Sequence, residues 1–433
     1  MSDPLIGLAG FAASLFLVAL RVPIALAMAA TGVIGFGIVN GFSTIGFILA
    51  AGPFEAIFPY SLSVVPLFLL MGVFASHSRM SADLFNAANA LVGHMRGGLA
   101  IAAIGACAGF GAICGSSLAT VATMGKVALP EMRKAGYQDQ LSAASIAAAG
   151  TLGVLIPPSI LLVIYGLLTE QSIGKLFSAA ILPGVLATVL YALAVTVAVH
   201  LKPDLATTVK RKSWAERGPA VRAAWPAGFL FLVVIGGIQF GLFSPTEAAA
   251  VGAGGAILIA VIRRTLTRQA ASAAMWETVS MTGMIFFIMI GATLFNYFIE
   301  TTGLPQFLIG AIEGADLSPL TVLLTIMLFY IVLGCFMDAL SMILLTVPFI
   351  FPVIVAQGFD PIWFGILIVT VAELGLITPP IGMNLFVIKG IAPDVSSTAI
   401  MKGMVPFLLA DCVRLVILIV FPGIVLWLPA LMF

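Results

Sequence analysis

Long apolar runs, separated by short polar or proline-containing stretches, dominate the chain. A membrane-spanning α-helix needs about 20 consecutive, mostly apolar residues. The pattern predicts five spans in each half of the chain. In the first half they lie near residues 4–20, 22–39, 63–75, 141–168 and 179–199, and in the second near 225–242, 247–262, 279–299, 362–388 and 403–428.

Two further apolar segments, residues 97–132 and 319–356, precede the fourth span of each half. Cytoplasmic loops of membrane proteins carry an excess of Lys and Arg. If the N-terminus is periplasmic and each segment enters and leaves by one face, the basic residues outside the apolar runs fall on the cytoplasmic side, with Lys175 alone opposite. We therefore predict two re-entrant hairpins, the first entered from the cytoplasm and the second from the periplasm. Both termini are then periplasmic.

The composition supports an all-α polytopic membrane protein. Hydrophobic residues make up 61% of the chain and charged residues 9%, against about 25% charged residues in soluble domains, which excludes a soluble fold. The net charge of +1 indicates no nucleic-acid partner. The four cysteines have no C-x-x-C spacing, so neither a zinc site nor a disulfide framework is predicted.

The two halves of the chain repeat each other. The motif G-x-x-x-P-P begins at Gly153 and again at Gly375, an offset of 222 residues, and Pro130 matches Pro352 at the same offset. Because each half has five spans, the second half starts on the opposite face, so the repeats are inverted, as in many transporters. The predicted first repeat is 1–201, a cytoplasmic linker is 202–224, and the second repeat is 225–433. The hairpins lie near 97–133 and 318–357.

A Pro-Pro pair inside a long apolar span must break the helix. It removes two amide donors and leaves carbonyl oxygens unpaired. Unpaired backbone at membrane depth occurs where it lines a polar cavity or is buried in protein. The breaks at Pro157-Pro158 and Pro379-Pro380 therefore predict two equivalent ion or substrate sites.

The hairpin tips supply the other half of each predicted site. The first tip reads GAICGSSLAT and the second GCFMDALSMI, with Asp338 at the position equivalent to Ser116. Carbonyl, hydroxyl and carboxylate oxygens suit a hard cation such as Na⁺. A serine in a membrane helix also commonly bonds its own backbone, and that alternative stays open for Ser116 and Ser117. Asp338 is the sharper candidate, because a carboxylate at membrane depth costs about 3 kcal/mol on insertion scales.

Other charges inside the spans are weaker candidates. Asp411 and Arg414 lie three residues apart on one helix face and are predicted to neutralise each other. Glu373 either faces the cavity or caps the broken helix. No His falls within a span, and no H-E-x-x-H or G-x-S-x-G motif occurs, so an intramembrane enzyme is not indicated. No phosphate-binding G-x-x-x-x-G-K-[ST] loop occurs either, which argues against ATP-driven transport.

Four runs carry a specific family resemblance: SSLATVATMGKVALPEM, GTLGVLIPPSI, YGLLTEQSIGKLF and GLITPPIGMNLFV. They resemble the large membrane subunit, DctM type, of tripartite ATP-independent periplasmic (TRAP) transporters. The resemblance covers essentially the whole chain. It implies an inverted-repeat fold of the ion-transporter superfamily, with two re-entrant hairpins and two broken helices, that works as an elevator. It also implies a Na⁺-driven importer of organic acids, carboxylates or sulfonates, in the bacterial inner membrane.

The resemblance further implies partners and site residues. The partners are a separate small four-helix membrane subunit and a periplasmic substrate-binding protein, and Na⁺ is the coupling ion, with no other cofactor. A stand-alone carrier of the same superfamily, which needs no binding protein, is the alternative. The implied first sodium site comprises Ser116, Ser117, Thr120, Gly150, Thr151, Gly153 and Pro157. The second comprises Asp338, Ser341, Gly375, Thr378, Pro379 and Asn384. The implied substrate site, between them, comprises Ser116, Ser117, Asp338, Pro158 and Pro380.

Overall fold

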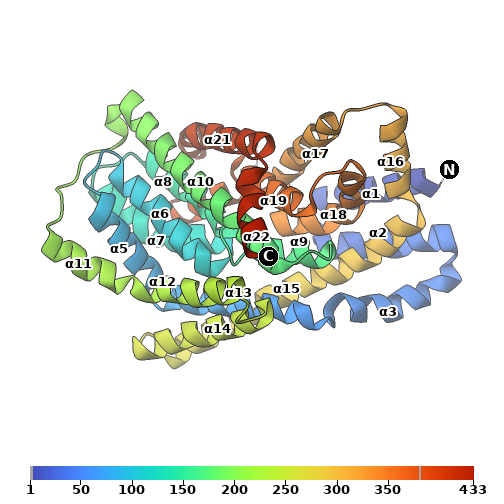
Figure 1. Cartoon of the computed structure of the whole chain (residues 1–433), viewed down its shortest axis with the longest axis horizontal. Coiled ribbons are helices and arrows are strands. Elements are labelled where there is room, and N and C mark those ends of the chain that lie inside the picture. Colours follow the sequence, from blue (N-terminus) through green and yellow to red (C-terminus); the bar gives the residue numbers. More distant parts are fainter. Residues whose placement is uncertain (1–2, 380–381) are drawn as a thin grey trace.

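The computed structural model describes residues 3–379 and 382–433, which are helical throughout apart from short turns and connections (Figure 1). The first half contains α1 (Asp3–Ala19), α2 (Ile24–Asn40), α3 (Ile45–Ile57), α4 (Val64–His77), α5 (Met80–Val92), α6 (Gly98–Cys114), α7 (Ser117–Lys134), α8 (Asp139–Leu155), α9 (Ile160–Leu168) and α10 (Ile173–Leu201). The second half contains α11 (Trp214–Ala223), α12 (Trp225–Phe231), α13 (Gly237–Gln239), α14 (Pro245–Ile262), α15 (Arg268–Thr301), α16 (Leu304–Gly314), α17 (Pro319–Gly334), α18 (Ala339–Ala356), α19 (Pro361–Ile377), α20 (Met383–Ile391), α21 (Ser397–Val420) and α22 (Gly423–Met432).

The apolar segments form a multi-pass membrane bundle. Within the described residues, six helices are long and apolar enough to cross a membrane, or up to eight when two bent helix pairs are each taken as one span. One bent pair is α8 with α9, which meet at 40°. Several other predicted spans, including α1, α2 and α19, are apolar helices of 17 residues.

Both predicted hairpins are present as helix pairs with short turns. Gly115 and Ser116 separate α6 from α7, and residues 335–338 separate α17 from α18. Gly115 ends α6 in the left-handed conformation, with φ +65°, a backbone region in which glycine has no steric penalty. Pro157 and Pro158 lie in the connection between α8 and α9, so the predicted break is confirmed in the first half. In the second half α19 ends at Ile377 and α20 begins at Met383, and Pro380 lies outside the described residues.

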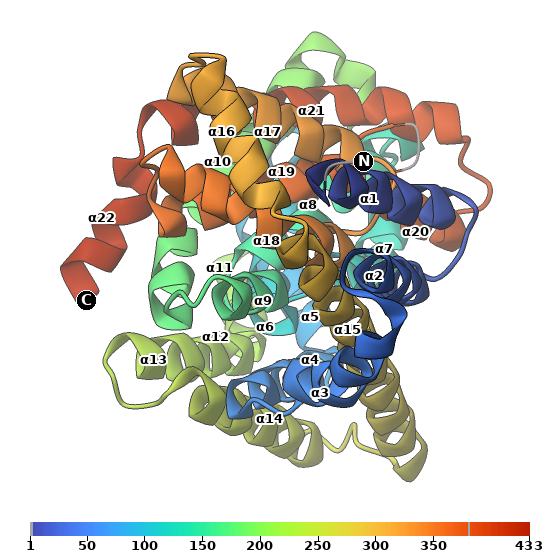
Figure 2. The same ribbon diagram turned by 90° about the vertical axis from the view of Figure 1, so that its right-hand side faces the viewer.

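Helices of one half pack on helices of the other in reciprocal pairs. The second helix α2 packs along α15, and α4 packs along α14. Hairpin arm α7 packs on α20, whereas hairpin arm α18 packs on α9. Figure 2 shows α3, α4 and α14 along one side of the molecule, with α8, α9 and α18 in its middle. The broken helices are therefore enclosed by both halves.

The structure differs from the sequence expectations in four places. The last predicted span, 403–428, is two helices, because α21 ends before Phe421 and α22 begins after Pro422. A helix absent from the predicted pattern, α16, follows α15 directly, and the hydrophilic linker contains α11, which packs on α5. Finally, α15 runs unbroken for 34 residues. At about 1.5 Å per residue it is roughly 50 Å long, more than the roughly 30 Å of a bilayer core.

Candidate functional site

The first hairpin meets the first broken helix through backbone-to-backbone contact. A Cβ added to Gly111 would lie 2.4 Å from the Cα of Gly153. A Cβ added to Gly115 would lie 2.8 Å from the carbonyl oxygen of Pro158. Because both hairpin positions are glycine, the tip reaches the backbone of the break itself. The tip therefore lies against the backbone of the break at Gly153 and at the Pro158 carbonyl.

The chemistry of the break follows from its two prolines. In an α-helix the carbonyl of each residue accepts a hydrogen bond from the amide four residues later. For Gly153 and Val154 those positions are Pro157 and Pro158, which have no N–H. The chain resumes its helix at Ser159, whose hydroxyl accepts from the Leu162 amide at 3.3 Å. The break thus supplies carbonyl oxygens of the kind that bind a hard cation.

Hydroxyl groups surround the start of the second arm, α7. The Ser116 hydroxyl caps this helix by accepting from the Ala119 amide at 3.4 Å. The Thr120 hydroxyl donates to the Ser116 carbonyl at 2.7 Å, and a Cβ on Gly153 would lie 2.7 Å from its Oγ1. Ser116, Thr120, Gly153 and the break are therefore brought together as the sequence predicts.

Ser117 points to a partner that the sequence places in the other predicted site. Its hydroxyl lies 3.0 Å from Oδ1 and 2.8 Å from Nδ2 of Asn384, at the start of α20. The Asn384 amide nitrogen also donates to the Ala147 carbonyl at 2.9 Å. Asn384 therefore contacts the first hairpin, because α20 packs across the two halves onto α7. The linear pattern carried no signal of this crossing.

Asp338 stands at the start of the second arm, α18. Its carboxylate accepts from the Ser341 amide at 3.0 Å and also from the Ser341 hydroxyl. This is the helix-capping position that Ser116 occupies in the first hairpin. Ser341 is fully buried, whereas Asp338 is half-buried. The carboxylate thus has a local capping role in addition to any ligand that it binds.

The second hairpin crosses the second broken helix in the same way as the first. A Cβ added to Gly375 would lie 2.6 Å from the Cα of Gly334. The Thr378 hydroxyl donates to the Leu374 carbonyl at 2.5 Å, and its amide donates to the Gly375 carbonyl at 3.2 Å. Pro379 follows directly. The two glycine crossings make the hairpins equivalent in their contacts.

Of two further residues predicted for the first site, Gly150 lies beside the start of α7, where an added Cβ would be 3.4 Å from the Ser117 carbonyl oxygen, whereas Thr151 faces α10. Gly150 packs against α7, where a Cβ would lie 2.1 Å from Cγ2 of Val121. The Thr151 hydroxyl donates to the Ala148 carbonyl at 2.8 Å and lies 3.2 Å from the Tyr191 hydroxyl. The Thr151 hydroxyl therefore points to Tyr191 of α10 and does not face Ser116. The helical period explains this difference, because Thr151 and Gly153 point about 200° apart around α8.

Glu373 takes neither of its two predicted roles. Its carboxylate lies 2.9 Å from Nη2 of Arg414, and the same nitrogen lies 3.0 Å from Asp411. All three side chains are no more than 1% exposed. The predicted Asp411–Arg414 pair is present, but it includes a second carboxylate from α19.

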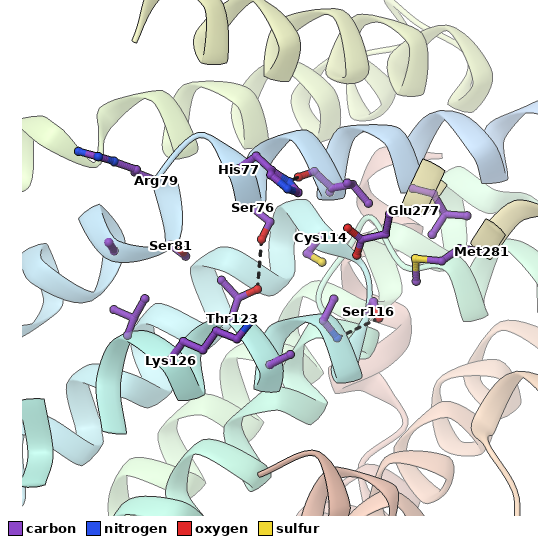
Figure 3. A pocket seen from close by; sticks show the side chains of 17 residues that line it. Ser76, His77, Arg79, Ser81, Cys114, Ser116, Thr123, Lys126, Glu277 and Met281 are labelled. Atoms are coloured by element: carbon purple, nitrogen blue, oxygen red, sulfur yellow. Dashed lines mark hydrogen bonds between the residues drawn. The ribbon is translucent and has the colours of Figure 1, made fainter. Parts of the chain in front are cut away.

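A cavity of about 500 Å³ opens beside the first hairpin tip (Figure 3). Its wall includes Ser116 and Cys114 at the tip, and the Ser76 hydroxyl of α4 lies 3.2 Å from the Thr123 hydroxyl of α7. Cationic Arg79 and Lys126 line it, with Glu277 from α15. Of the residues predicted to contact substrate, Ser116 lines this cavity, whereas Ser117, Pro158 and Asp338 are not among its described lining residues.

Ion pairs tie the base of the first hairpin to both halves at the surface. Arg133 lies 2.7 Å from Asp139 and 2.6 Å from Asp394. A hydrogen bond from its own backbone N–H, followed by the bond from Arg133, holds the pKa of the Asp394 carboxyl below its ordinary value. Arg133 and Asp139 are half-buried and Asp394 is exposed, so these pairs near the surface contribute little to stability.

Comparison with known proteins identifies the family. The family model "Tripartite ATP-independent periplasmic transporter, DctM component" matches residues 11–424, almost the whole chain. The chain belongs to the DctM family. It is therefore the large permease subunit of a TRAP transporter, a multi-pass membrane protein and not an enzyme.

The permease has several similar relatives. It is 38% identical to the C4-dicarboxylate TRAP transporter large permease protein DctM of Pseudomonas aeruginosa, over 88% of this chain and 89% of the relative. It is 38% identical to the ectoine/5-hydroxyectoine large permease protein UehC of Ruegeria pomeroyi, over 87% of each. It is 35% identical to the isethionate TRAP transporter permease protein DctMQ of Oleidesulfovibrio alaskensis, over 90% of this chain and 61% of that longer relative.

The fold also matches a solved transporter structure. The YdaH transporter of Alcanivorax borkumensis superposes with a TM-score of 0.64 over 89% of each chain, at 17% sequence identity. The predicted all-α multi-span fold with a broken helix is therefore confirmed for the permease.

Proposed function

We propose that the permease is a Na⁺-coupled importer of an organic acid. The observation that carries this proposal is the first hairpin tip, where the Thr120 hydroxyl and the Ser116 carbonyl lie against Gly153, whose own carbonyl loses its helical donor at Pro157. The second hairpin offers an equivalent arrangement at Asp338. Oxygen ligands from a broken helix and a hairpin suit a hard cation held near the bilayer midplane. Substrate then binds between the two tips.

Relatives and cavity charge support an organic anion as substrate. The relatives are named for C4-dicarboxylates, ectoine and isethionate, all of which carry a carboxylate or sulfonate group. The cavity beside Ser116 is lined by Arg79 and Lys126. Arg79 lies on the predicted cytoplasmic side, so we assign this cavity to the release route of the substrate. Cationic side chains raise the local concentration of an anion along such a route.

The proposed transport movement is that of an elevator in an inverted repeat. We name α1–α5 and α12–α16 the frame, and α6–α10 with α17–α21 the hairpin body. The first hairpin packs on α20 through α7, and the second packs on α9 through α18. Because each hairpin packs on the broken helix of the other half, these elements are expected to move as one body. Moving the whole body keeps ion ligands from both halves together.

The partners and the membrane follow from the family. A periplasmic binding protein delivers the substrate, and a small membrane subunit accompanies the permease in a bacterial inner membrane, with both termini of the permease periplasmic. The isethionate relative, a longer permease protein named DctMQ, supports the small subunit.

The coupling ion is tested by reconstitution. The permease, its small subunit and its binding protein are placed in proteoliposomes with a labelled organic acid that the binding protein binds. An inward Na⁺ gradient, an inward proton gradient and ATP are then supplied one at a time. We expect accumulation with Na⁺ alone. Full accumulation on a proton gradient without sodium would overturn the proposal, and uptake without the binding protein would favour the stand-alone carrier.

Substitution of Asp338 separates capping from ion binding. Asp338→Ala removes both the cap, worth about 1 kcal/mol, and the charge. Asp338→Ser keeps a capping hydroxyl, as Ser116 has in the first hairpin. Hydrogen bonds to charged groups are worth about 1.5–3 kcal/mol, so we expect both variants to need roughly tenfold more sodium for half-maximal uptake. Wild-type sodium dependence in Asp338→Ser would show that the carboxylate only caps α18.

A further inference from the structure

A closed polar cluster lies between the two broken helices. It consists of five side chains that are each no more than 1% exposed: Thr151 of α8, Tyr191 of α10, Glu373 of α19, and Asp411 and Arg414 of α21. The Thr151 and Tyr191 hydroxyls lie 3.2 Å apart, and the Tyr191 hydroxyl donates to Asp411 at 2.7 Å. Arg414 contacts Asp411 at 3.0 Å and Glu373 at 2.9 Å. The chain of contacts therefore runs from the first half to the second without a gap.

The cluster contains the same contact twice, once from each repeat. Thr151 stands six residues before Pro157, and Glu373 stands six residues before Pro379. Tyr191 follows Pro183 by eight residues, and Arg414 follows Pro406 by eight. The Thr151–Tyr191 hydrogen bond and the Glu373–Arg414 ion pair are thus equivalent contacts, one neutral and one charged. Asp411 joins them, so the cluster lies where the two repeats meet.

Each end of the cluster is close to a glycine crossing. Thr151 lies two residues before Gly153, which meets Gly111 of the first hairpin. Glu373 lies two residues before Gly375, which meets Gly334 of the second hairpin. A movement of either helix end, when a cation binds beside its hairpin, must shift the nearer end of the cluster because an α-helix is rigid over half a turn.

Stability alone is a weak reason for such a cluster. Buried ion pairs are often replaced by apolar side chains without loss of stability, and charged groups inside a membrane carry a cost. A hydrogen-bonded charge network does hold its members in one relative arrangement. Nε and Nη1 of Arg414 have no hydrogen-bond partner among the described residues. The cluster therefore leaves part of the guanidinium group without hydrogen bonds.

We infer that this cluster couples the two proposed sodium sites, with Tyr191 and Arg414 as positioning residues that transmit the state of one broken helix to the other. The inference rests on the proposed function. Coupling between sites is reciprocal and appears as cooperativity, with a Hill coefficient bounded by the number of sites. Cutting the cluster leaves each site intact and removes the cooperativity.

The test is a sodium titration of the purified full-length permease. Tryptophan fluorescence reports the binding, and choline replaces sodium so that the ionic strength stays constant. Tyr191→Phe removes the one hydroxyl that joins Thr151 to Asp411. The matched control is Tyr165→Phe, which removes another buried hydroxyl between the halves, bonded to the Pro361 carbonyl at 2.7 Å but outside the cluster. We expect a Hill coefficient above one in the wild type and in Tyr165→Phe, and a value of one in Tyr191→Phe.

A second variant keeps the inference testable if Tyr191→Phe does not fold. Thermal unfolding is measured to check that each variant is folded. Glu373→Gln keeps the shape of the side chain, removes one buried charge and weakens its bond to Arg414, since charge-assisted bonds are about twice as strong as neutral ones. We expect this variant to lower the Hill coefficient as well. Wild-type cooperativity in a folded Tyr191→Phe or Glu373→Gln variant, or an equal loss in Tyr165→Phe, would overturn the inference. A wild type without any sodium response would instead overturn the proposed sodium coupling, and this inference with it.

Discussion

Gly111→Ala is expected to abolish transport while a neighbouring substitution in the same helix has no effect. The new Cβ would lie 2.4 Å from the Cα of Gly153 and 2.9 Å from its nitrogen. Both obstacles are backbone atoms, so the hairpin must separate from the broken helix. Overpacking costs about 1–3 kcal/mol, and the upper value corresponds to on the order of a hundredfold loss of the packed arrangement.

The matched control is Gly105→Ala, also in α6, where an added Cβ meets nothing within 4 Å. Alanine is a better helix former than glycine, so this variant keeps or raises stability. Sodium-driven uptake in proteoliposomes and thermal unfolding are measured for both variants. Normal uptake by a folded Gly111→Ala variant would show that the close crossing is not required. Gly375→Ala tests the equivalent crossing, where the Cβ would lie 2.6 Å from Gly334.

Joining the frame to the hairpin body is expected to stop transport completely and reversibly. Ser76 of α4 and Thr123 of α7 have hydroxyl oxygens 3.2 Å apart across the proposed sliding surface (Figure 3). Cysteines at both positions are close enough for a disulfide or a mercury bridge. The four native cysteines are first replaced, since they would compete. An elevator cannot complete its cycle when the hairpin body is crosslinked to the frame in one position. Uptake should therefore fall to background on oxidation.

Reduction should restore this uptake, and each single-cysteine variant should be insensitive to oxidation. These controls separate locking from damage by the oxidant. Crosslinked permease that still transports at its reduced rate would show that α7 does not move against α4. Rocking of the two halves, or a local opening of the hairpin, would then replace the elevator.

The hydrophobic pattern was sufficient to predict the class of protein, the two hairpins and the first helix break. Apolar runs and the positions of proline act locally, so they can be interpreted without knowing which helices meet. The pair Pro157-Pro158 breaks its helix wherever that helix packs, because the missing amides are a covalent property. Capping at Ser116 and Asp338 is likewise local, and their equivalence was visible in the repeat.

Contacts between distant segments were beyond the linear pattern. The family resemblance implied Asn384 in the second sodium site, yet its side chain bonds Ser117 of the first hairpin. The family resemblance implied Thr151 in the first sodium site, yet its hydroxyl faces Tyr191. Glu373 was predicted to face the cavity or to cap the broken helix, yet its carboxylate forms an ion pair with Arg414. The repeat held a usable signal for the last two, because Thr151 matches Glu373 and Tyr191 matches Arg414.

The sequence by itself determined an all-helical membrane protein with repeated motifs in its two halves, hairpins that turn at glycine and polar residues, and a first break at a proline pair. Each of these depends on hydrophobic length, backbone geometry and missing donors, which a chain carries residue by residue. Only the tertiary structure decided that α20 crosses to the first hairpin and that a charged cluster joins the broken helices. Those contacts arise from the packing of whole helices, where a rotation of 100° per residue decides which side chain faces which partner.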